Sequence, residues 1–134
     1  MSEDQKHLST TSYASLPLDA RLLKSINKAG FTHCTPIQEA AIPVTLKGND
    51  IAGQAQTGTG KSAAFLISTF QRLLTIREQE ARKPNQVRAL ILAPTRELAI
   101  QIHKDAISLS SELDFGISVA VSYTHLTLPT TSRV

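Results

Sequence analysis

The chain has 134 residues with a net charge of +3, and 41% of its residues are hydrophobic and 19% charged. This length corresponds to about one domain of ~100–200 residues, and the composition is typical of a globular protein. No apolar run approaches the ~20 residues that a membrane-spanning helix needs, which argues against a membrane protein, and a single cysteine excludes a disulfide framework.

Two helices are predicted before residue 50. The first covers Leu18 to Ala29, with Asp19 as its N-cap and Gly30 as its stop. The second begins at Thr35, where a capping threonine precedes a proline and a glutamine follows three residues later. Pro43 is expected to break or kink this second helix.

The rest of the chain alternates between short apolar runs and helical patterns. A turn at 48–50 is followed by a strand at 50–55 and a helix at 61–75. After a charged, polar loop at 77–87, the pattern predicts a strand at 88–93, a helix from residue 95 and a third strand at 115–121. This alternation predicts an α/β fold with a parallel sheet flanked by helices.

A glycine-bearing loop lies between the first strand and its following helix, and reads Ala55-Gln56-Thr57-Gly58-Thr59-Gly60-Lys61-Ser62. Gly58 and Gly60 let backbone N–H groups turn toward phosphate oxygens, and the helix N-terminus favours the same anions. The Lys61 ammonium can reach the β- and γ-phosphates, and the Ser62 hydroxyl can ligate Mg²⁺. Ala55 occupies the first glycine position of the generic phosphate-loop pattern, and the alternative is a glycine-rich turn.

Gln38 has two interpretations. With Thr35 it forms a capping box, which needs no ligand. Its side-chain amide also matches the N6 and N7 atoms of adenine with two hydrogen bonds. The phosphate loop downstream favours the second role, and both can hold through different atoms.

The segment after the 88–93 strand reads Pro94-Thr95-Arg96-Glu97. Backbone N–H groups at this helix start, together with Thr95 and Arg96, could bind an RNA phosphate. A helix cap with an Arg96–Glu97 surface pair explains the same residues.

Taken together, these three segments resemble the N-terminal RecA-like domain of the DEAD-box ATP-dependent RNA helicases. Gly30-Phe31 followed by Thr35-Pro36-Ile37-Gln38 is similar to the Q motif, residues 55–62 to motif I, and residues 94–99 to motif Ia. Alanine is the norm at the first position of that motif I. Tyr13 falls where an isolated aromatic residue of the family stacks on adenine, usually as Phe. The residues of several motifs are most similar to those of the bacterial RhlB-like branch.

The resemblance implies an enzyme that binds ATP and Mg²⁺, hydrolyses ATP when RNA is bound, and locally unwinds an RNA duplex. Lys61 and Ser62 would be its catalytic residues here, and the acid of motif II is absent from the sequence. Tyr13, Phe31, Thr35 and Gln38 would complete the ATP contacts, and residues 94–97 would bind RNA. A cytoplasmic location and a link to RNA-degradation machinery are further expectations.

The resemblance covers residues 13–121, and it predicts a partial, truncated RecA-like P-loop domain there. Residues 1–12 are expected to be a flexible leader, and residues 122–134 a tail of foreign origin. The chain alone is therefore expected to be inactive as a helicase. Two alternatives stay open, which are another P-loop NTPase such as a superfamily 2 DNA helicase, and a non-functional fragment or interaction module.

Overall fold

The computed structural model describes residues 8–54, 60–77 and 86–121. These residues form a 3-10 turn, η2 (Tyr13–Ser15), and four α-helices, namely α1 (Ala20–Lys28), α2 (Pro36–Leu46), α3 (Lys61–Arg77) and α4 (Arg96–Leu109). None of these helices is long and apolar enough to cross a membrane.

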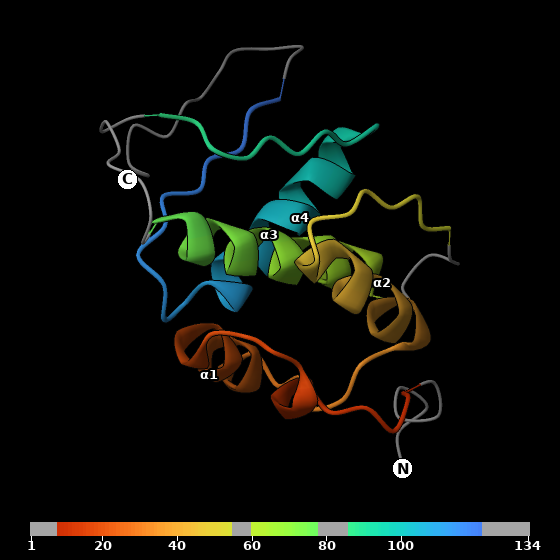
Figure 1. Cartoon of the computed structure of the whole chain (residues 1–134). Coiled ribbons are helices and arrows are strands. Elements are labelled where there is room, and N and C mark those ends of the chain that lie inside the picture. The colour runs from red at the N-terminus through yellow and green to blue at the C-terminus, as the bar shows by residue number, and fades with distance from the viewer. Residues whose placement is uncertain (1–7, 55–59, 78–85, 122–134) are drawn as a thin grey trace.

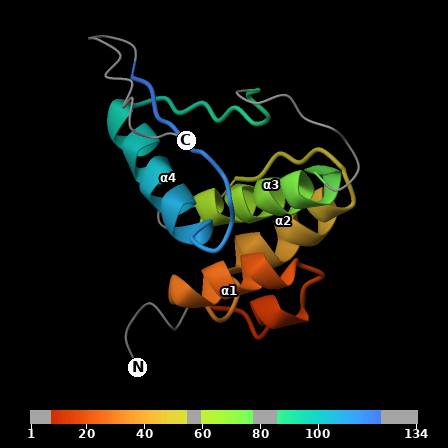
Figure 2. The same cartoon turned by 90° about the vertical axis from the view of Figure 1, so that its left-hand side faces the viewer.

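Helix α3 is the centre of the described structure. It contacts α1, α2 and α4, and α1 also contacts α4, so the four helices enclose one core (Figures 1 and 2). The most deeply buried apolar side chains come from all four helices, and they are Leu22, Ile26, Ile42, Leu66, Ile67 and Leu109. Burying each such side chain contributes roughly 1.5–3 kcal/mol of hydrophobic stabilisation.

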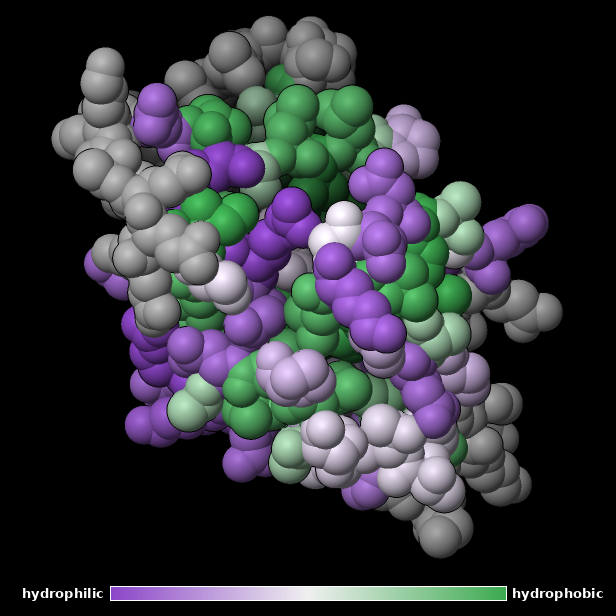
Figure 3. All heavy atoms as spheres, viewed as in Figure 1, coloured by the Kyte–Doolittle hydropathy of each residue, from purple (hydrophilic) through white to green (hydrophobic). Residues whose placement is uncertain are grey.

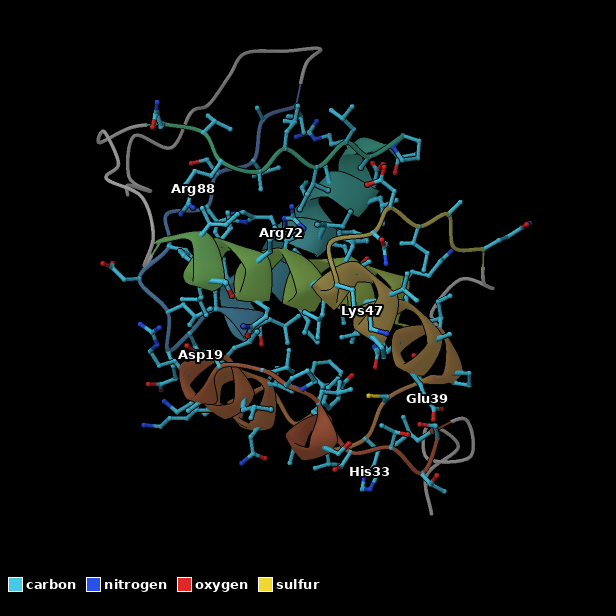
Figure 4. The ribbon with its side chains drawn as sticks, viewed as in Figure 1. Asp19, His33, Glu39, Lys47, Arg72 and Arg88 are labelled. Carbon is cyan, nitrogen blue, oxygen red and sulfur yellow. The ribbon has the colours of Figure 1, made fainter. Side chains whose placement is uncertain are left out.

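The helix starts follow their local sequence signals. Asp19 caps α1, and its Oδ1 accepts a hydrogen bond from the Arg21 N–H at 2.9 Å (Figure 4). Gly30, just beyond α1, has a φ of 92°, a left-handed conformation that suits glycine. Thr95 caps α4 by accepting from the Leu98 N–H at 3.1 Å. The predicted helices at 18–29, 61–75 and from residue 95 are confirmed, with shifts of one or two residues at their ends.

Pro43 does not break α2. The helix runs from Pro36 through Pro43 to Leu46, so of the predicted break or kink the break does not occur, and the kink stays a prediction. Pro43 lacks only its own N–H, whose acceptor would be the carbonyl of the exposed Glu39, four residues earlier. Beyond Pro43, the Thr45 hydroxyl bonds to the Ser68 hydroxyl of α3 at 2.6 Å, which fastens the last turn of α2 to the core.

The three predicted strands are not formed by the described residues of 50–54, 88–93 and 115–121. Among the described residues, the single β-bridge joins Ser12 and His33 in antiparallel sense. A strand needs a partner along its edge, and the first two of these segments expose large apolar side chains instead, with Leu90 at 77% and Leu92 at 84% exposure. The parallel sheet therefore stays a prediction.

The last described segment nevertheless packs on the helices. The Phe115 ring lies 5.6 Å from the Phe70 ring of α3, and the His103 Nε2 of α4 is 3.3 Å from the Ile117 carbonyl oxygen. The path of residues 115–117 beside α3 and α4 is thus set by side-chain contacts.

Backbone bonds hold the start of the described chain to the segment before α2. Ser9 N–H donates to the Cys34 carbonyl at 2.8 Å, Cys34 N–H donates to the Thr11 carbonyl at 2.9 Å, and Tyr13 N–H donates to the Thr32 carbonyl at 3.1 Å. Cys34 is fully buried by this arrangement, and burial raises the pKa of its thiol to about 11. The described part of the expected leader, residues 8–12, therefore lies against the body of the protein.

Candidate functional site

The Gln38 side chain is the centre of the candidate site. It is 1% exposed and lies in the first turn of α2. Its Oε1 accepts hydrogen bonds from the Thr35 N–H at 3.0 Å and from the Tyr13 hydroxyl. Its Nε2 donates to the Gly60 carbonyl at 3.1 Å. One amide thus connects three residues that the sequence singled out separately.

The bond from Thr35 confirms that Gln38 takes part in the predicted capping box of α2. The same amide also reaches the start of α3 through Gly60. Because Gly60 is the last residue before α3, Gln38 fixes the N-terminus of α3 against that of α2. The sequence patterns predicted the cap but carried no signal for this second bond.

Gly60 is required by both its backbone and its neighbours. Its φ is 85°, in the left-handed region. A Cβ atom on this residue would lie 2.3 Å from the Gln38 Nε2 and 3.1 Å from the Thr35 Oγ1. The close approach between the end of the glycine loop and α2 therefore depends on the missing side chain.

Lys61 and Ser62 form the first turn of α3, directly after Gly60. Lys61 is exposed and Ser62 is half-buried. Free backbone N–H groups and the helix dipole make such a helix start a favourable place for phosphate. Residues 55–59, the rest of the predicted phosphate loop, lie outside the described residues.

Tyr13 lies in the core beside Gln38. Its side chain is 2% exposed, and its ring meets the Phe31 ring edge-on at a centroid distance of 6.5 Å. Burial, and secondarily the nearby Cys34, raise the pKa of the Tyr13 hydroxyl, so it stays a hydrogen-bond donor at neutral pH. Phe31 is 42% exposed and offers ring surface to solvent. The adenine contacts expected of Tyr13 and Phe31 stay predictions.

A second group of predicted residues lies at the start of α4. Pro94, Thr95, Arg96 and Glu97 are all exposed. The Thr95 hydroxyl serves as the helix cap, which confirms the predicted cap, whereas the Arg96–Glu97 surface pair stays a prediction. Its RNA contact stays a prediction.

The described residues contain no metal site built from protein side chains alone. Within residues 8–54, 60–77 and 86–121, no cluster of three or more His, Cys, Asp and Glu side chains could hold a metal ion. The expected contact with Mg²⁺ through Ser62 and a bound nucleotide does not depend on such a cluster.

Known proteins resemble this chain in sequence. The model of the DEAD/DEAH box helicase family matches residues 35–132. The ATP-dependent RNA helicase RhlB of Psychromonas ingrahamii is 53% identical over 117 residues, which is 87% of this chain and 28% of that protein. RhlB of Shewanella denitrificans is 55% identical over 119 residues, which is 89% of this chain and 27% of that protein. The predicted resemblance to RhlB-like helicases is thereby confirmed.

A solved structure gives the same result for the fold. The RNA helicase Prp28 from Chaetomium thermophilum, bound to ADP, has a TM-score of 0.70 and 39% identity, covering 87% of this chain and 28% of that one. This similarity supports the predicted RecA-like fold. The family match runs into the stretch expected to be foreign, residues 122–134, which lies outside the described residues.

Proposed function

Because the chain belongs to the DEAD/DEAH box helicase family, we propose that it is the ATP-binding half of an ATP-dependent RNA helicase. In the whole protein, RNA binding would stimulate ATP hydrolysis and a short RNA duplex would be separated locally. The present chain spans about 28% of the RhlB relative from Psychromonas ingrahamii. The observation that carries the proposal is the bond from Gln38 to Gly60, which joins the adenine-reading candidate to the end of the phosphate loop.

The described residues fit a nucleoside triphosphate with its Mg²⁺ ion. The absence of a Cβ on Gly60 lets Gln38 approach the residue that directly precedes α3, so the candidate adenine reader lies beside the N-terminus of α3, which favours phosphate. The Lys61 ammonium would bind the β- and γ-phosphates, and the Ser62 hydroxyl would ligate the ion. A bound Mg²⁺ ion would neutralise negative charge on the phosphate groups.

RNA is the proposed second ligand. The exposed Thr95 and Arg96 lie at the N-terminus of α4, where backbone N–H groups favour a phosphate of the RNA chain. A cytoplasmic location and association with RNA-degradation machinery also belong to this proposal. Both are expectations that follow from the resemblance to the RhlB-like branch.

Hydrolysis is not expected of these 134 residues by themselves. The sequence holds no Asp-Glu-Ala-Asp stretch, so the acid that helps to hold Mg²⁺ in the family is missing. We therefore expect the chain to bind ATP or ADP and to leave ATP uncleaved.

The test is nucleotide binding by the purified chain and its Lys61→Ala variant. Isothermal titration with ADP and Mg²⁺ should give a Kd that rises about 10- to 100-fold in Lys61→Ala, because a charged hydrogen bond to phosphate is lost. Lys104→Ala, which removes an exposed lysine of α4, is the matched control and should bind as the wild type does.

Two outcomes would contradict the proposal. Equal affinity of the wild type and a folded Lys61→Ala variant would exclude the phosphate loop as the binding site. Equal affinity for ADP and GDP would argue for another P-loop NTPase, because a site that reads adenine through Gln38 discriminates between the two bases.

A further inference from the structure

The orientation of the Gln38 amide is fixed by two backbone groups. The Thr35 N–H can only donate, so the atom facing it at 3.0 Å is the oxygen Oε1. The Gly60 carbonyl can only accept, so the atom facing it at 3.1 Å is the nitrogen Nε2. The Tyr13 hydroxyl faces Oε1 and must therefore donate to it.

This orientation uses the acceptor capacity of Gln38 completely. An amide oxygen has two lone pairs, and here one takes the Thr35 N–H and the other takes the Tyr13 hydroxyl. The Nε2 group has two hydrogens, and among the described residues only the Gly60 carbonyl accepts one of them.

The two adenine atoms that Gln38 would contact have opposite hydrogen-bonding roles. Its N7 accepts a hydrogen bond, which the second Nε2 hydrogen can supply, whereas its N6 amino group donates and needs a free lone pair on Oε1. The Thr35 N–H belongs to the cap of α2 and cannot leave without weakening that helix. The Tyr13 hydroxyl is the donor whose removal leaves the helix cap in place.

We propose that the Tyr13 hydroxyl competes with the adenine N6 amino group for the Gln38 Oε1, and so sets how strongly the site discriminates between bases. This inference rests on the proposed function, because it assumes that Gln38 reads adenine. Tyr13 is a positioning and specificity-determining residue in this scheme. It acts through Gln38, whether or not its ring touches the base.

The surroundings keep the hydroxyl in place. Backbone bonds from Tyr13 to Thr32 and between Thr11 and Cys34 hold this segment beside the start of α2. The Thr11 hydroxyl donates to the Glu39 carboxylate of α2 at 2.6 Å and strengthens the same contact (Figure 4, where Glu39 is labelled). Because Gln38 is 1% exposed, adenine reaches it only after local movement, and breaking the Tyr13 bond is part of that cost.

The test compares two nucleotides that differ at one group. ADP carries the N6 amino group, and purine riboside 5′-diphosphate lacks it but keeps N7. The ratio of their Kd values, measured with the full chain by titration calorimetry, isolates the N6 contact. In Tyr13→Phe the preference for ADP should increase about 2- to 10-fold, which corresponds to one net hydrogen bond. If Tyr13→Phe does not fold, Tyr13→Leu also removes the hydroxyl and should shift the ratio in the same direction.

Two further variants show whether the effect passes through Gln38. In a Gln38→Ala background, Tyr13→Phe should leave the ratio unchanged. Ser25→Ala is the matched control, because the Ser25 hydroxyl is also buried and also joins two elements, accepting from the Glu112 N–H at 2.9 Å. It should lower the melting temperature and leave the ratio of the two Kd values as in the wild type.

The results separate this inference from the proposed function. ADP binding that depends on Lys61, combined with an unchanged or lowered ratio in Tyr13→Phe, would overturn the competition alone. A shift that persists in the Gln38→Ala background would also overturn it. ADP binding that is absent or independent of Lys61 would overturn the proposed function and this inference together.

Discussion

Gly60 and Gly30 share a positive φ but differ in their surroundings. Their φ angles are 85° and 92°, and both would strain any residue with a side chain. A Cβ on Gly30 would meet nothing within 4 Å, whereas one on Gly60 would lie 2.3 Å from the Gln38 Nε2. Alanine substitutions at the two glycines therefore distinguish the free-energy cost of backbone strain from the added cost of a clash with Gln38.

We expect Gly60→Ala to lower the free energy of unfolding more than Gly30→Ala does. Backbone strain should cost about 1–2 kcal/mol in both variants, and the clash with Gln38 adds to it only at Gly60. Urea denaturation of the two variants measures the difference. The loss of unfolding free energy caused by Gly60→Ala should be smaller when it is introduced into a Gln38→Ala background. An equal loss in Gly60→Ala and Gly30→Ala would contradict the contact between Gly60 and Gln38.

At the scale of helices, Glu112 fastens the end of α4 to α1. Its carboxylate accepts from the Lys28 ammonium and lies 3.7 Å from the Lys24 ammonium, while its N–H donates to the Ser25 hydroxyl at 2.9 Å. The bond from Lys28, with a smaller contribution from Lys24, lowers the pKa of Glu112 below its ordinary value of 4.5. A carboxyl with a lowered folded pKa stabilises the protein above the ordinary value, and this contribution is lost as the pH falls through the folded pKa.

Stability should therefore fall on acidification partly through Glu112. The melting temperature of the wild type should drop more between pH 7 and pH 3 than that of Glu112→Gln, which has no carboxylate to protonate. Asp105→Asn, which removes a carboxylate of α4 bonded to the neutral Gln101 side chain, should keep a response closer to the wild type. Equal drops in the wild type and Glu112→Gln would show that this link does not contribute.

The helices were predictable because their signals are local. The Asp19 and Thr95 side chains accept from backbone N–H groups two and three residues later, and the Gln38 side chain accepts from the Thr35 N–H three residues earlier, so a short stretch of sequence contains each interaction. The contact between Gln38 and Gly60 joins residues 22 positions apart, and the hydroxyl of Tyr13 reaches Gln38 across 25 positions. Such contacts depend on how the helices pack, which no local pattern encodes. Pro43 shows the converse, because the helix continues past the point where the local rule predicts a break or a kink, and its last turn is bonded to α3 through Thr45 and Ser68.

At the scale of the whole molecule, the segment before α4 carries the most exposed large apolar side chains of the described residues. Val87, Leu90 and Leu92 are 83%, 77% and 84% exposed. The hydropathy surface shows hydrophobic residues along this segment, above α3 in the view of Figure 3. Several exposed large apolar side chains in one short segment favour self-association.

The 134-residue chain should therefore associate as its concentration rises. Light scattering after size-exclusion chromatography should give an average mass above that of the monomer, and Leu90→Asp combined with Leu92→Asp should return it to the monomer value. Ile107→Asp is the control, because this residue is a 49% exposed apolar side chain on α4, outside the segment. A monomeric wild type at every concentration, or an equal mass in the double variant, would contradict the expectation.

The burial of Cys34 has a consequence for how the candidate site can be followed in time. The chain has one cysteine, which is buried and whose backbone bonds to Ser9 and Thr11, in the segment that leads to Tyr13. We expect a thiol reagent to react faster with Cys34 when the segment bonded to it, Ser9 to Thr11, detaches, and the raised pKa keeps the thiol protonated and slow to react in the closed state. The rate at which Cys34 is labelled therefore reports how often the segment beside the candidate site opens, and this measurement needs no introduced cysteine.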